Sequence, residues 1–375
     1  MLVVAQTGEA TGFGRIARHI AAAVGVEGPV DLFGAGPGAG WRAHDPPASD
    51  PWRVGSAAAV VEGVRPRAVI VVGTASFTDN LLRVAEPHPR ARLVAYVPVE
   101  GHLRGGGDRD GLRRADAIVA YQEEGARELR ALLPDGPAVQ VVPHPTLVGA
   151  PVTGMSRAEA RRGLFPDVGD RADGLWVLNA NRNDSRKDLA CTMRVFAHAA
   201  RESPDASLVL RGAAWSRAGG SLVDLAERLG LAGRVLFARR AAPAPGAWTD
   251  EHMATLYRCC EIGVNTARGE AWGMASFEHA ALGAAQAVPG HATLRETWAG
   301  APTWLPLGGS VAIDRRTEGH AVDERQAAHA LRRLLTDAAA REGVASACRA
   351  RATAAALTPA AVAARWRGVV RALGV

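Results

Sequence analysis

The sequence predicts an α/β protein made of two Rossmann-like domains in tandem. Its 375 residues exceed what one hydrophobic core usually organises. Short apolar runs alternate with amphipathic stretches, a pattern that predicts strand–helix units and parallel sheets. Two series of this kind follow one another. We therefore expect an N-terminal domain over residues 1–148, a C-terminal domain over residues 149–355, and a helix over residues 356–375 that packs back on the N-terminal domain.

The first series supplies the N-terminal domain. Helices are expected over residues 13–24 and 124–133. Residues 34–52 are rich in glycine and proline and are expected to form a loop. The expected strands are short apolar runs, and they cover residues 2–5, 29–33, 68–72, 93–97, 117–120 and 139–142.

The second series supplies the C-terminal domain. In open α/β sheets, ligands bind beyond the carboxyl ends of the strands, so the residues that follow each strand are the first candidates for a site. The alanine-rich tail over residues 358–373 is expected to be helical. The expected strands cover residues 175–178, 207–210, 235–238, 262–265, 285–288 and 310–313.

Composition indicates a water-soluble protein. Hydrophobic residues make up 48% of the chain and charged residues 22%. The apolar runs are shorter than the roughly 18 residues of a membrane helix, and residues 1–8 lack the features of a signal peptide. The four cysteines fit neither a zinc pattern nor a disulfide framework, so we expect a reduced, cytoplasmic protein. They are Cys191, Cys259, Cys260 and Cys348. Membrane association is not expected, although one basic loop keeps contact with a membrane surface open as an alternative.

The net charge of +6 raises the question of an anionic partner. The arginines are scattered and not interleaved with aromatic residues, so nucleic acid is not expected. The densest cluster, Arg104, Arg109, Arg113 and Arg114, is interpreted as a solvated loop, with contact to an anionic acceptor or a membrane surface as the alternative. The sole Asp-x-Asp, at residues 108–110, lies in this loop, and no metal site is expected.

The segment from Gly269 to Glu278 carries the clearest functional signal. Glu270 and Glu278 lie eight positions apart and enclose Gly273, just after the apolar run of residues 259–264. The residues from Met274 onward are expected to form a helix, whose first N–H groups are unpaired and suit a phosphate. This arrangement would place one carboxylate beside a phosphate and the other near a sugar, and it therefore suits a nucleotide-sugar.

A second signal is Lys187, the only lysine among 44 basic residues. The composition favours arginine wherever either cation serves, so a retained lysine indicates a need for a compact ammonium. Lys187 follows the apolar run of residues 175–178 and precedes an expected helix. The alternative interpretation is a chance lysine at a solvated helix start.

With these motifs in place, the chain resembles the retaining glycosyltransferases of family 4, which have the two-domain GT-B architecture. The resemblance covers most of residues 65–315 and is strongest over residues 176–298. Glu270 and Glu278 match the family's E-x7-E signature, and Arg182 and Lys187 match its Arg-x4-Lys pair. The stretches around Glu100 (Pro-Val-Glu-Gly) and before His144 (Val-Pro-His) are also similar. The chain departs from the family at Ala271, where glycine is usual, and at Ala275, where proline is common.

The resemblance implies two Rossmann-like domains that face each other across a central cleft. The N-terminal domain would bind a small-molecule or saccharide acceptor, and the C-terminal domain would bind a nucleoside-diphosphate sugar. It further implies transfer with retained stereochemistry and without a metal or other cofactor. The leaving phosphate would take the proton of the acceptor hydroxyl.

The resemblance also assigns roles on the donor side. Arg182 and Lys187 would hold the diphosphate, Glu278 the ribose hydroxyls, and Glu270 the sugar. Gly273 and Met274 would offer helical N–H groups. Trp272 is either a stacking surface for the sugar or a core residue, and Asn181 is a weaker candidate.

On the acceptor side, Gly12 and Gly14 would allow the backbone to approach the diphosphate or the acceptor. Glu100 or His102 would orient the acceptor hydroxyl, with Glu100 favoured. His144 is a weaker candidate.

Three alternatives stay open. Gly12 and Gly14, with Asp31 on the next strand, imitate the fingerprint of an NAD(P)-dependent dehydrogenase, although Gly12 comes some six residues after its strand. A nucleotide-sugar-binding subunit without catalytic activity and a GT-B epimerase are the other two. The nucleotide base, the sugar and the acceptor are not determined by the sequence.

Overall fold

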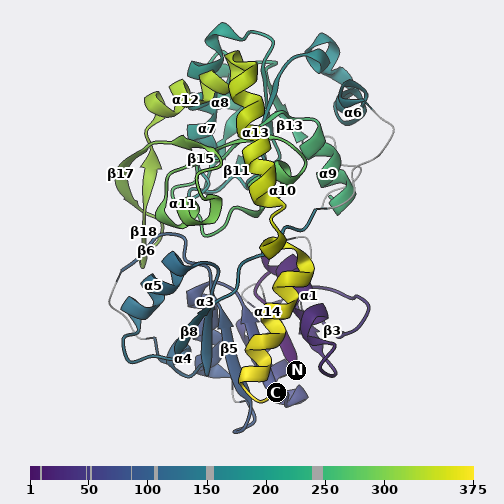
Figure 1. Ribbon diagram of the computed structural model, residues 1–375, viewed down its shortest axis with the longest axis vertical. Coiled ribbons are helices and arrows are strands. Elements are labelled where there is room, and N and C mark those ends of the chain that lie inside the picture. Colours follow the sequence, from purple (N-terminus) through teal and green to yellow (C-terminus); the bar gives the residue numbers. More distant parts are fainter. Residues whose placement is uncertain are drawn as a thin grey trace. The chain divides into compact units, whose positions relative to one another are not determined.

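The computed structural model describes residues 1–8, 11–47, 49–50, 53–85, 87–104, 109–148, 156–238 and 248–375. The chain divides into two compact units (Figure 1). The N-terminal unit comprises Met1–Pro145 and Ala355–Val375, and the C-terminal unit comprises Thr146–Ala354. The predicted start of the C-terminal domain, residue 149, lies outside the described residues.

The N-terminal unit contains a parallel sheet with the strand order β3-β2-β1-β4-β5-β7-β8. Helices cover both of its faces, so the central strands are buried on both sides and consist of continuous apolar residues. The strands of this unit are β1 (Leu2–Ala5), β2 (Asp31–Phe33), β3 (Arg42–His44), β4 (Ala68–Val72), β5 (Arg92–Tyr96), β6 (His102–Leu103), β7 (Ala117–Ala120) and β8 (Ala138–Val141).

The helices of the N-terminal unit begin at polar caps and bury an apolar face. Thr11 caps α1 by accepting a hydrogen bond from the backbone N–H of Gly14 at 3.1 Å. The last helix, α14, packs on α1 (Figure 1) and carries the fully buried Trp366. The helices are α1 (Gly12–Val24), α2 (Val54–Val64), α3 (Ala75–Val84), α4 (Asp110–Arg113), α5 (Glu123–Leu132), the short 3-10 turn η4 (Ala355–Leu357) and α14 (Pro359–Ala372).

The C-terminal unit repeats this plan with a parallel sheet in the order β13-β10-β9-β14-β15-β16. Two antiparallel ribbons, β11 with β12 and β17 with β18, stand apart from that sheet. The strands are β9 (Trp176–Asn179), β10 (Ser207–Leu210), β11 (Trp215–Ser216), β12 (Gly220–Ser221), β13 (Val235–Phe237), β14 (Ile262–Val264), β15 (Ala285–Pro289), β16 (Thr303–Leu305), β17 (Leu307–Ala312) and β18 (Thr317–Val322).

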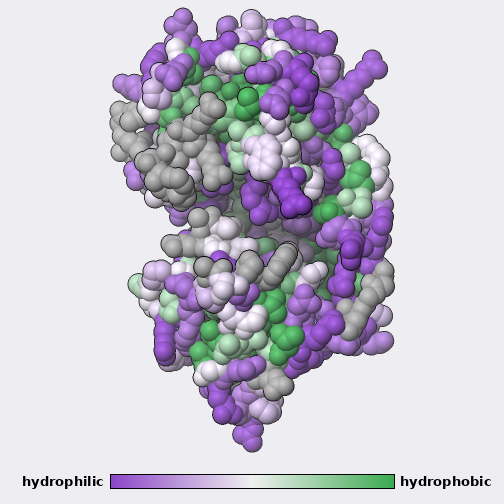
Figure 2. Space-filling view, turned by 180° about the vertical axis from the view of Figure 1, so that it is seen from behind, coloured by the Kyte–Doolittle hydropathy of each residue, from purple (hydrophilic) through white to green (hydrophobic). Residues whose placement is uncertain are grey.

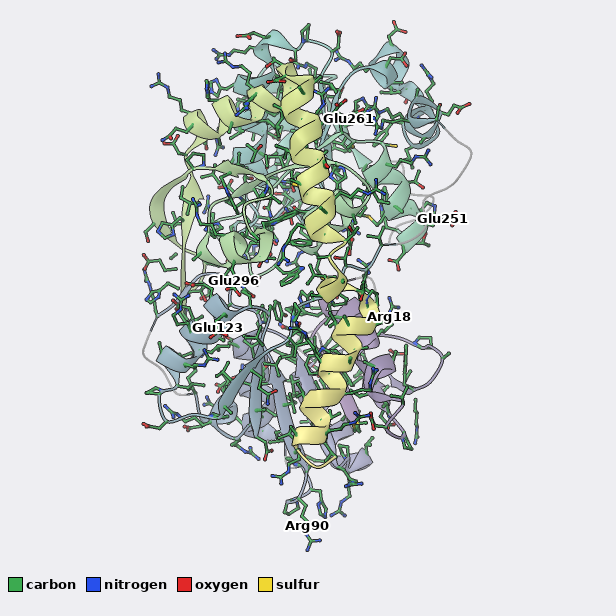
Figure 3. The ribbon with its side chains drawn as sticks, viewed as in Figure 1. Arg18, Arg90, Glu123, Glu251, Glu261 and Glu296 are labelled. Atoms are coloured by element: carbon green, nitrogen blue, oxygen red, sulfur yellow. The ribbon has the colours of Figure 1, made fainter. Side chains whose placement is uncertain are left out.

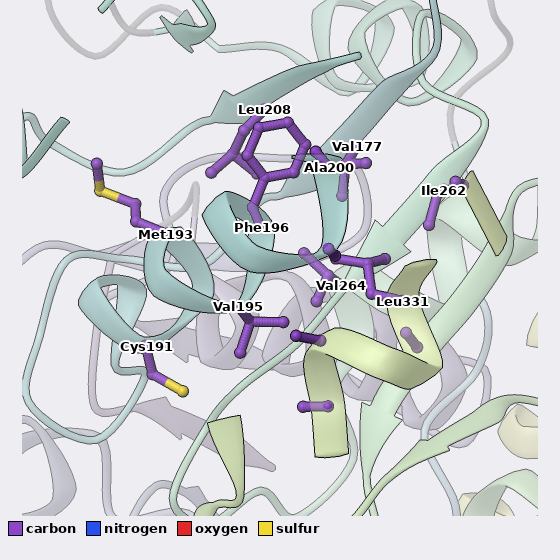
Figure 4. Packing of buried hydrophobic residues seen from close by; sticks show 14 of the residues in the cluster. Val177, Cys191, Met193, Val195, Phe196, Ala200, Leu208, Ile262, Val264 and Leu331 are labelled. Carbon is purple, nitrogen blue, oxygen red and sulfur yellow. The ribbon is translucent and has the colours of Figure 1, made fainter. Parts of the chain in front are cut away.

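Helices cover the C-terminal sheet, and a hydrophobic core joins them to it. In Figure 4, Phe196 of α7 packs with Leu208 of β10 and Val177 of β9, and Leu331 of α12 lies in the same cluster. These side chains are at most 1% exposed, and each contributes about 1.5–3 kcal/mol by its burial. The helices are α6 (Arg157–Leu164), η1 (Pro166–Asp173), α7 (Leu189–Ala199), η2 (Ala200–Glu202), α8 (Leu222–Arg228), α9 (Asp250–Arg258), α10 (Met274–Ala281), α11 (Ala292–Trp298), α12 (Glu324–Thr336) and α13 (Ala338–Ala352).

The predicted α/β class with two Rossmann-like sheets is confirmed, but three local predictions were wrong. The basic cluster was expected to be a solvated loop, yet Arg109 is 5% exposed and Arg113 ends the short helix α4. Residues 34–52 were expected to form a loop, yet β3 lies within them and adds an edge strand beside β2. Residues 310–313 were expected to continue the parallel series, yet they fall mostly in β17, which pairs antiparallel with β18. The parallel sheet is completed instead by β16. The errors at β3 and β17 concern edge strands, whose half-exposed residues lack a continuous apolar pattern.

Candidate active site

Two loops meet at the carboxyl edge of the C-terminal sheet. One follows β9 and the other follows β14, and these strands are neighbours, with Val177 opposite Ile262. Hydrogen bonds join the loops: the backbone N–H of Arg268 donates to the carbonyl of Arg186 at 2.8 Å, and the Thr266 hydroxyl donates to the carbonyl of Asp188 at 2.9 Å. The two loops therefore hold each other in one arrangement.

Glu270 is the centre of this arrangement. Glu270 is 6% exposed and Lys187 is 8% exposed, and the carboxylate of the first forms an ion pair with the ammonium of the second. Nη1 of Arg186 lies 3.9 Å from the same carboxylate and donates to the carbonyl of Gly269 at 2.8 Å. The side-chain amide of Asn265 donates to Glu270 at 3.4 Å. Sequence motifs far apart in the chain are thus brought into contact.

The surroundings of Glu270 keep it ionised. Burial by itself raises the pKa of a carboxyl, because it removes water from the charged form. The positive charges of Lys187 and Arg186, together with hydrogen bonds from Lys187 and Asn265, outweigh burial and lower the pKa of Glu270 to about 2. A negative charge is therefore fixed at this position at neutral pH.

Gly273 leads from Glu270 into α10. Its φ of +82° lies in the left-handed region, which glycine adopts without strain. A Cβ at this position would lie 3.6 Å from Cγ of Glu270, so the turn runs close against the carboxylate. The turn places the start of α10, at the half-buried Met274, next to Glu270.

Trp272 lies in the core of this region. It is 3% exposed, and its ring centroid lies 5.3 Å from that of Phe277. Of the two interpretations left open by the sequence, the packing favours a core residue. The backbone of Glu270 is fixed from the other side by α11, because the Thr293 hydroxyl donates to its carbonyl at 2.7 Å.

Glu278 lies on α10, in its second turn. It is 4% exposed and accepts a hydrogen bond from the hydroxyl of Tyr257 on α9 at 3.0 Å. Both glutamates of the E-x7-E signature are therefore buried and held by named partners.

Arg182 behaves differently from Lys187 although both belong to the loop after β9. Its side chain is 72% exposed and lies 3.4 Å from Asp184. Arg186, which the sequence analysis did not select, takes the position beside Glu270. A left-handed turn at Asp188, with a φ of +47°, follows these basic residues and begins α7.

Other contributors were also missed from the sequence. Asn265 carried a signal, since it is the first residue after β14. Tyr257 and Thr293 carried none, because they lie on helices and are more than 20 residues away from the glutamates that they contact, Tyr257 at the carboxylate of Glu278 and Thr293 at the backbone carbonyl of Glu270.

The candidates of the N-terminal unit lie at the carboxyl edge of its sheet. Gly12 is exposed and Gly14 is buried at the start of α1. Glu100 is half-buried, and its charge adds to burial in raising the pKa of the Tyr121 hydroxyl. His102 is 67% exposed and lies 3.1 Å from Glu128 of α5.

Aromatic side chains stiffen this edge. The Tyr96 hydroxyl donates to the carbonyl of Val142 at 3.0 Å and lies 2.9 Å from Nδ1 of His144. The ring of Tyr121 lies 4.0 Å from that of His144. His144 is 4% exposed and therefore belongs to the buried edge rather than to an open surface.

Within the described ranges there is no group of three or more histidine, cysteine, aspartate or glutamate side chains that could hold a metal ion. Asp108 of the Asp-x-Asp, and residues 105–108 of the basic loop, lie outside those ranges. No helix in the described part of the chain is long and apolar enough to cross a membrane. On the face shown in Figure 2, hydrophilic residues predominate and hydrophobic ones form separate patches.

No protein-family profile and no curated protein sequence matches the chain. Solved structures do match it. Sucrose-phosphate synthase from Thermosynechococcus elongatus superposes with a TM-score of 0.74 at 18% identity, over 100% of this chain and 98% of that one. HepE from Anabaena, solved with UDP and glucose, has a TM-score of 0.68 at 14% identity, over 99% and 98%. α,α-Trehalose 6-phosphate synthase from Burkholderia multivorans has a TM-score of 0.66 at 13% identity, over 100% and 97%.

These similar structures are GT-B glycosyltransferases, and the match extends over both units. The fold of the chain is therefore GT-B, with two Rossmann-like domains. At these identities the likeness defines the fold alone.

Proposed function

We propose that the protein is a retaining glycosyltransferase of the family 4 type, which moves a sugar from a nucleoside-diphosphate sugar to a hydroxyl acceptor without a metal. The observation that carries the proposal is the buried contact of Lys187 with Glu270, beside Gly273 and the start of α10. A fixed carboxylate, clustered cations and a helix N-terminus meet there, at the sheet edge where ligands bind in this class of fold.

The donor diphosphate is assigned to the cations. Arg182 lies exposed on the loop after β9 and has a guanidinium fork that suits phosphate oxygens. Lys187 adds a compact charge at the base of the loop. Charged hydrogen bonds contribute about 1.5–3 kcal/mol each, whereas a helix N-terminus contributes about 0.3–1 kcal/mol. Loss of the cations is therefore expected to weaken donor binding more than a change in α10.

The transfer step is assigned to Glu270 and the leaving diphosphate. The bond between the anomeric carbon and the phosphate oxygen breaks, and the acceptor oxygen forms its bond to that carbon from the same face. The proton of the acceptor hydroxyl passes to the leaving phosphate. Ionised Glu270 holds hydroxyls of the sugar and stabilises the positive charge that develops at the anomeric carbon. Glu278 is assigned to the ribose hydroxyls.

The acceptor is assigned to the N-terminal unit, with Gly12 and Gly14 offering close approach to its backbone. Glu100 is the preferred residue to orient the acceptor hydroxyl, because it is half-buried near Tyr121, whereas His102 is exposed and already bonded to Glu128. A soluble small molecule or saccharide is the proposed acceptor. A cytoplasmic location is also proposed, and it is supported by the four buried, free cysteines.

A dehydrogenase is disfavoured by two features of the N-terminal unit. β1 ends at Ala5 and α1 begins only at Gly12, so this connection is longer than the tight phosphate turn of the dinucleotide fingerprint. Asp31 is the first residue of β2, at the amino edge of the sheet, and it contacts His44 at 2.7 Å. The ribose-binding acid of that fingerprint would lie at the opposite edge. Absence of fluorescence quenching on mixing with NAD(P)H is the expected result.

The donor site is tested by nucleotide binding and turnover. A thermal-shift screen of UDP, GDP, ADP and dTDP sugars is expected to single out one nucleotide. With that donor, Lys187→Ala and Glu270→Ala should each lower turnover more than tenfold. Because each change leaves a buried charge without its partner, folding is checked by thermal melting, and Lys187→Arg is included as a variant that keeps the charge.

Glu261→Gln is the matched control. Glu261 forms an ion pair with Arg161 at 2.7 Å and accepts from the backbone of Trp176, so it lies at the amino edge of the same sheet (Figure 3). This control should keep full turnover per folded molecule. Equal turnover in the control and in the Lys187 and Glu270 variants would refute the donor site. Donor binding without transfer to any hydroxyl acceptor would favour a binding subunit, and interconversion of the donor sugar would favour an epimerase.

The absence of a metal requirement is tested separately. Turnover is expected to survive EDTA, because the cations of the loop neutralise the diphosphate. Loss of turnover that manganese restores would refute this part of the proposal.

A further inference from the structure

A group of basic side chains, five arginines and one histidine, surrounds two adjoining hollows in the N-terminal unit. The hollows have volumes of about 600 Å³ and 570 Å³ and share His88, Arg90 and Arg92 in their linings. Arg114 lines the first hollow, and Arg65 and Arg67 line the second. We call these six residues the basic rim. Arg90 points away from the sheet at the lower end of the unit in Figure 3.

The basic rim lies at the amino edge of the sheet. Arg92 is the first residue of β5 and pairs in register with Ala68, the first residue of β4, and Arg67 directly precedes β4. Glu100 and Tyr121 follow the carboxyl ends of β5 and β7. The rim is therefore on the opposite edge from the residues proposed for the acceptor, and it is not part of that site.

The positive charge of the rim is only partly compensated. Arg92 forms an ion pair with Asp116 at 2.8 Å. In the described part of the chain, Asp116 is the only acidic side chain that lines either hollow. Arg114 is held by backbone carbonyls, including that of Ala85 at 3.3 Å.

The other three arginines carry the excess charge. Arg67 contacts the carbonyl of Gly374 at 3.5 Å. Among the described residues, Arg65, Arg67 and Arg90 have no acidic partner within 4.0 Å, and all three side chains are exposed. Three guanidinium groups thus border the hollows without an ion pair to an acidic side chain of the described residues, although Val375 lies beside them in the second hollow and Asp116, paired with Arg92, in the first.

We propose that the basic rim binds a small, multiply charged anion of the phosphate class. Crowded like charges repel one another, and a polyanion relieves that repulsion while it accepts forked hydrogen bonds from several guanidinium groups. The inference is independent of sugar transfer, since it uses none of the residues assigned to donor or acceptor.

The shape and composition of the rim favour a small anion over a phospholipid surface. The hollows are concave, and membrane-surface sites usually add exposed hydrophobic side chains that enter the bilayer. The large hydrophobic side chains that are exposed in the described ranges are Val26, Val84 and Trp215, and none of them lines either hollow.

Tripolyphosphate is the probe, and isothermal titration calorimetry at low ionic strength is the measurement. The variant Arg65→Gln/Arg67→Gln/Arg90→Gln is expected to weaken binding at least tenfold. Because the Debye length is about 10 Å at 0.1 M salt, binding should also weaken as salt rises. The substituted side chains are exposed, so folding should persist, and Arg90→Gln alone serves as a milder change with a smaller loss in the same direction.

Two control variants test whether binding depends on the rim itself. Arg182→Gln alters the proposed donor loop and removes tripolyphosphate bound there, so the rim substitutions are also made in this background and should weaken binding by the same factor. Arg228→Gln/Arg315→Gln/Arg349→Gln removes the same charge from exposed positions of the C-terminal unit and should leave rim binding unchanged. Binding within twofold of the parent protein in the rim variant, or equal weakening in the second control, would overturn the proposal.

Vesicle binding distinguishes a lipid headgroup from a small soluble anion as the source of the phosphate. Vesicles of phosphatidylcholine with phosphatidic acid are sedimented with the parent protein and with the rim variant. No rim-dependent sedimentation is expected. Rim-dependent sedimentation in the absence of tripolyphosphate binding would assign the surface to lipid headgroups and overturn the small-anion proposal.

Discussion

Replacing Glu270 by glutamine removes the charge at the centre of the candidate site and leaves its shape. The pKa of Glu270 falls from 4.5 to about 2 in the folded protein, because the charges of Lys187 and Arg186 outweigh burial. One pKa unit corresponds to about 1.4 kcal/mol, so ionised Glu270 contributes about 3 kcal/mol to the stability of the C-terminal unit at neutral pH. We expect Glu270→Gln to lose about that amount at pH 7.

The direction of the pKa shift determines how this loss of stability depends on pH. The folded pKa lies below the unfolded one, so the contribution is fully present above pH 4.5 and disappears as the pH falls toward 2. The stability difference between the parent protein and Glu270→Gln should therefore shrink to about 1 kcal/mol at pH 3. Urea unfolding monitored by tryptophan fluorescence between pH 7 and pH 3 measures it.

A double variant tests whether Lys187 is the cause. Breaking one side of a buried pair leaves an unpaired charge, whereas removing both sides does not. Glu270→Gln with Lys187→Met should therefore be more stable than Glu270→Gln alone. The reasoning fails if Glu270→Gln matches the parent protein at pH 7, or if their difference stays constant down to pH 3.

Three further predictions concern the same unit. Gly273→Ala should lose about 1–2 kcal/mol of stability in thermal melting, because alanine is strained at a φ of +82°. The control Gly283→Ala, at a φ of +94° with no atom within 4 Å of the added Cβ, should lose as much stability but keep its affinity for the donor. Burial lowers the pKa of His279 from 6.5 to about 4, so the parent protein should lose about 3 kcal/mol between pH 6.5 and pH 4, and His279→Gln should flatten that part of its urea-unfolding profile. Tyr257→Phe should cost about 1.5–3 kcal/mol in urea unfolding, because Glu278 loses a hydrogen bond to its charge; an unchanged midpoint would contradict this.

Much of the fold follows from the sequence because strands buried on both faces have a distinctive composition. β1 and β4 are uninterrupted apolar runs, and every residue of both is at most 1% exposed. β3 has the sequence Arg-Ala-His and lies at the sheet edge, where burial does not impose an apolar pattern. Its pairing with β2 is a tertiary event that local sequence does not encode.

The candidate site, like the fold, could be predicted from the sequence only in part. Glu270 and Lys187 were selected because each follows a buried strand, and the structure brings them into contact because neighbouring parallel strands bring their loops together. The choice of Arg182 over Arg186 depended on spacing, whereas the structure turns Arg186 toward Glu270 and leaves Arg182 exposed. Which side chain of a loop turns inward depends on backbone dihedral angles, such as the left-handed turn at Asp188, that residue spacing does not reveal.

The path of the chain has a consequence for producing the units separately. Residues 355–375 belong to the N-terminal unit, so the polypeptide passes from one unit to the other at two places. Trp366 of α14 is fully buried and lies 4.9 Å from the ring of Tyr96. A fragment that stops at Pro145 would therefore expose a hydrophobic seam. A peptide that spans residues 355–375 should cover this seam again when it is added to the fragment. The N-terminal unit is therefore suited to fragment complementation.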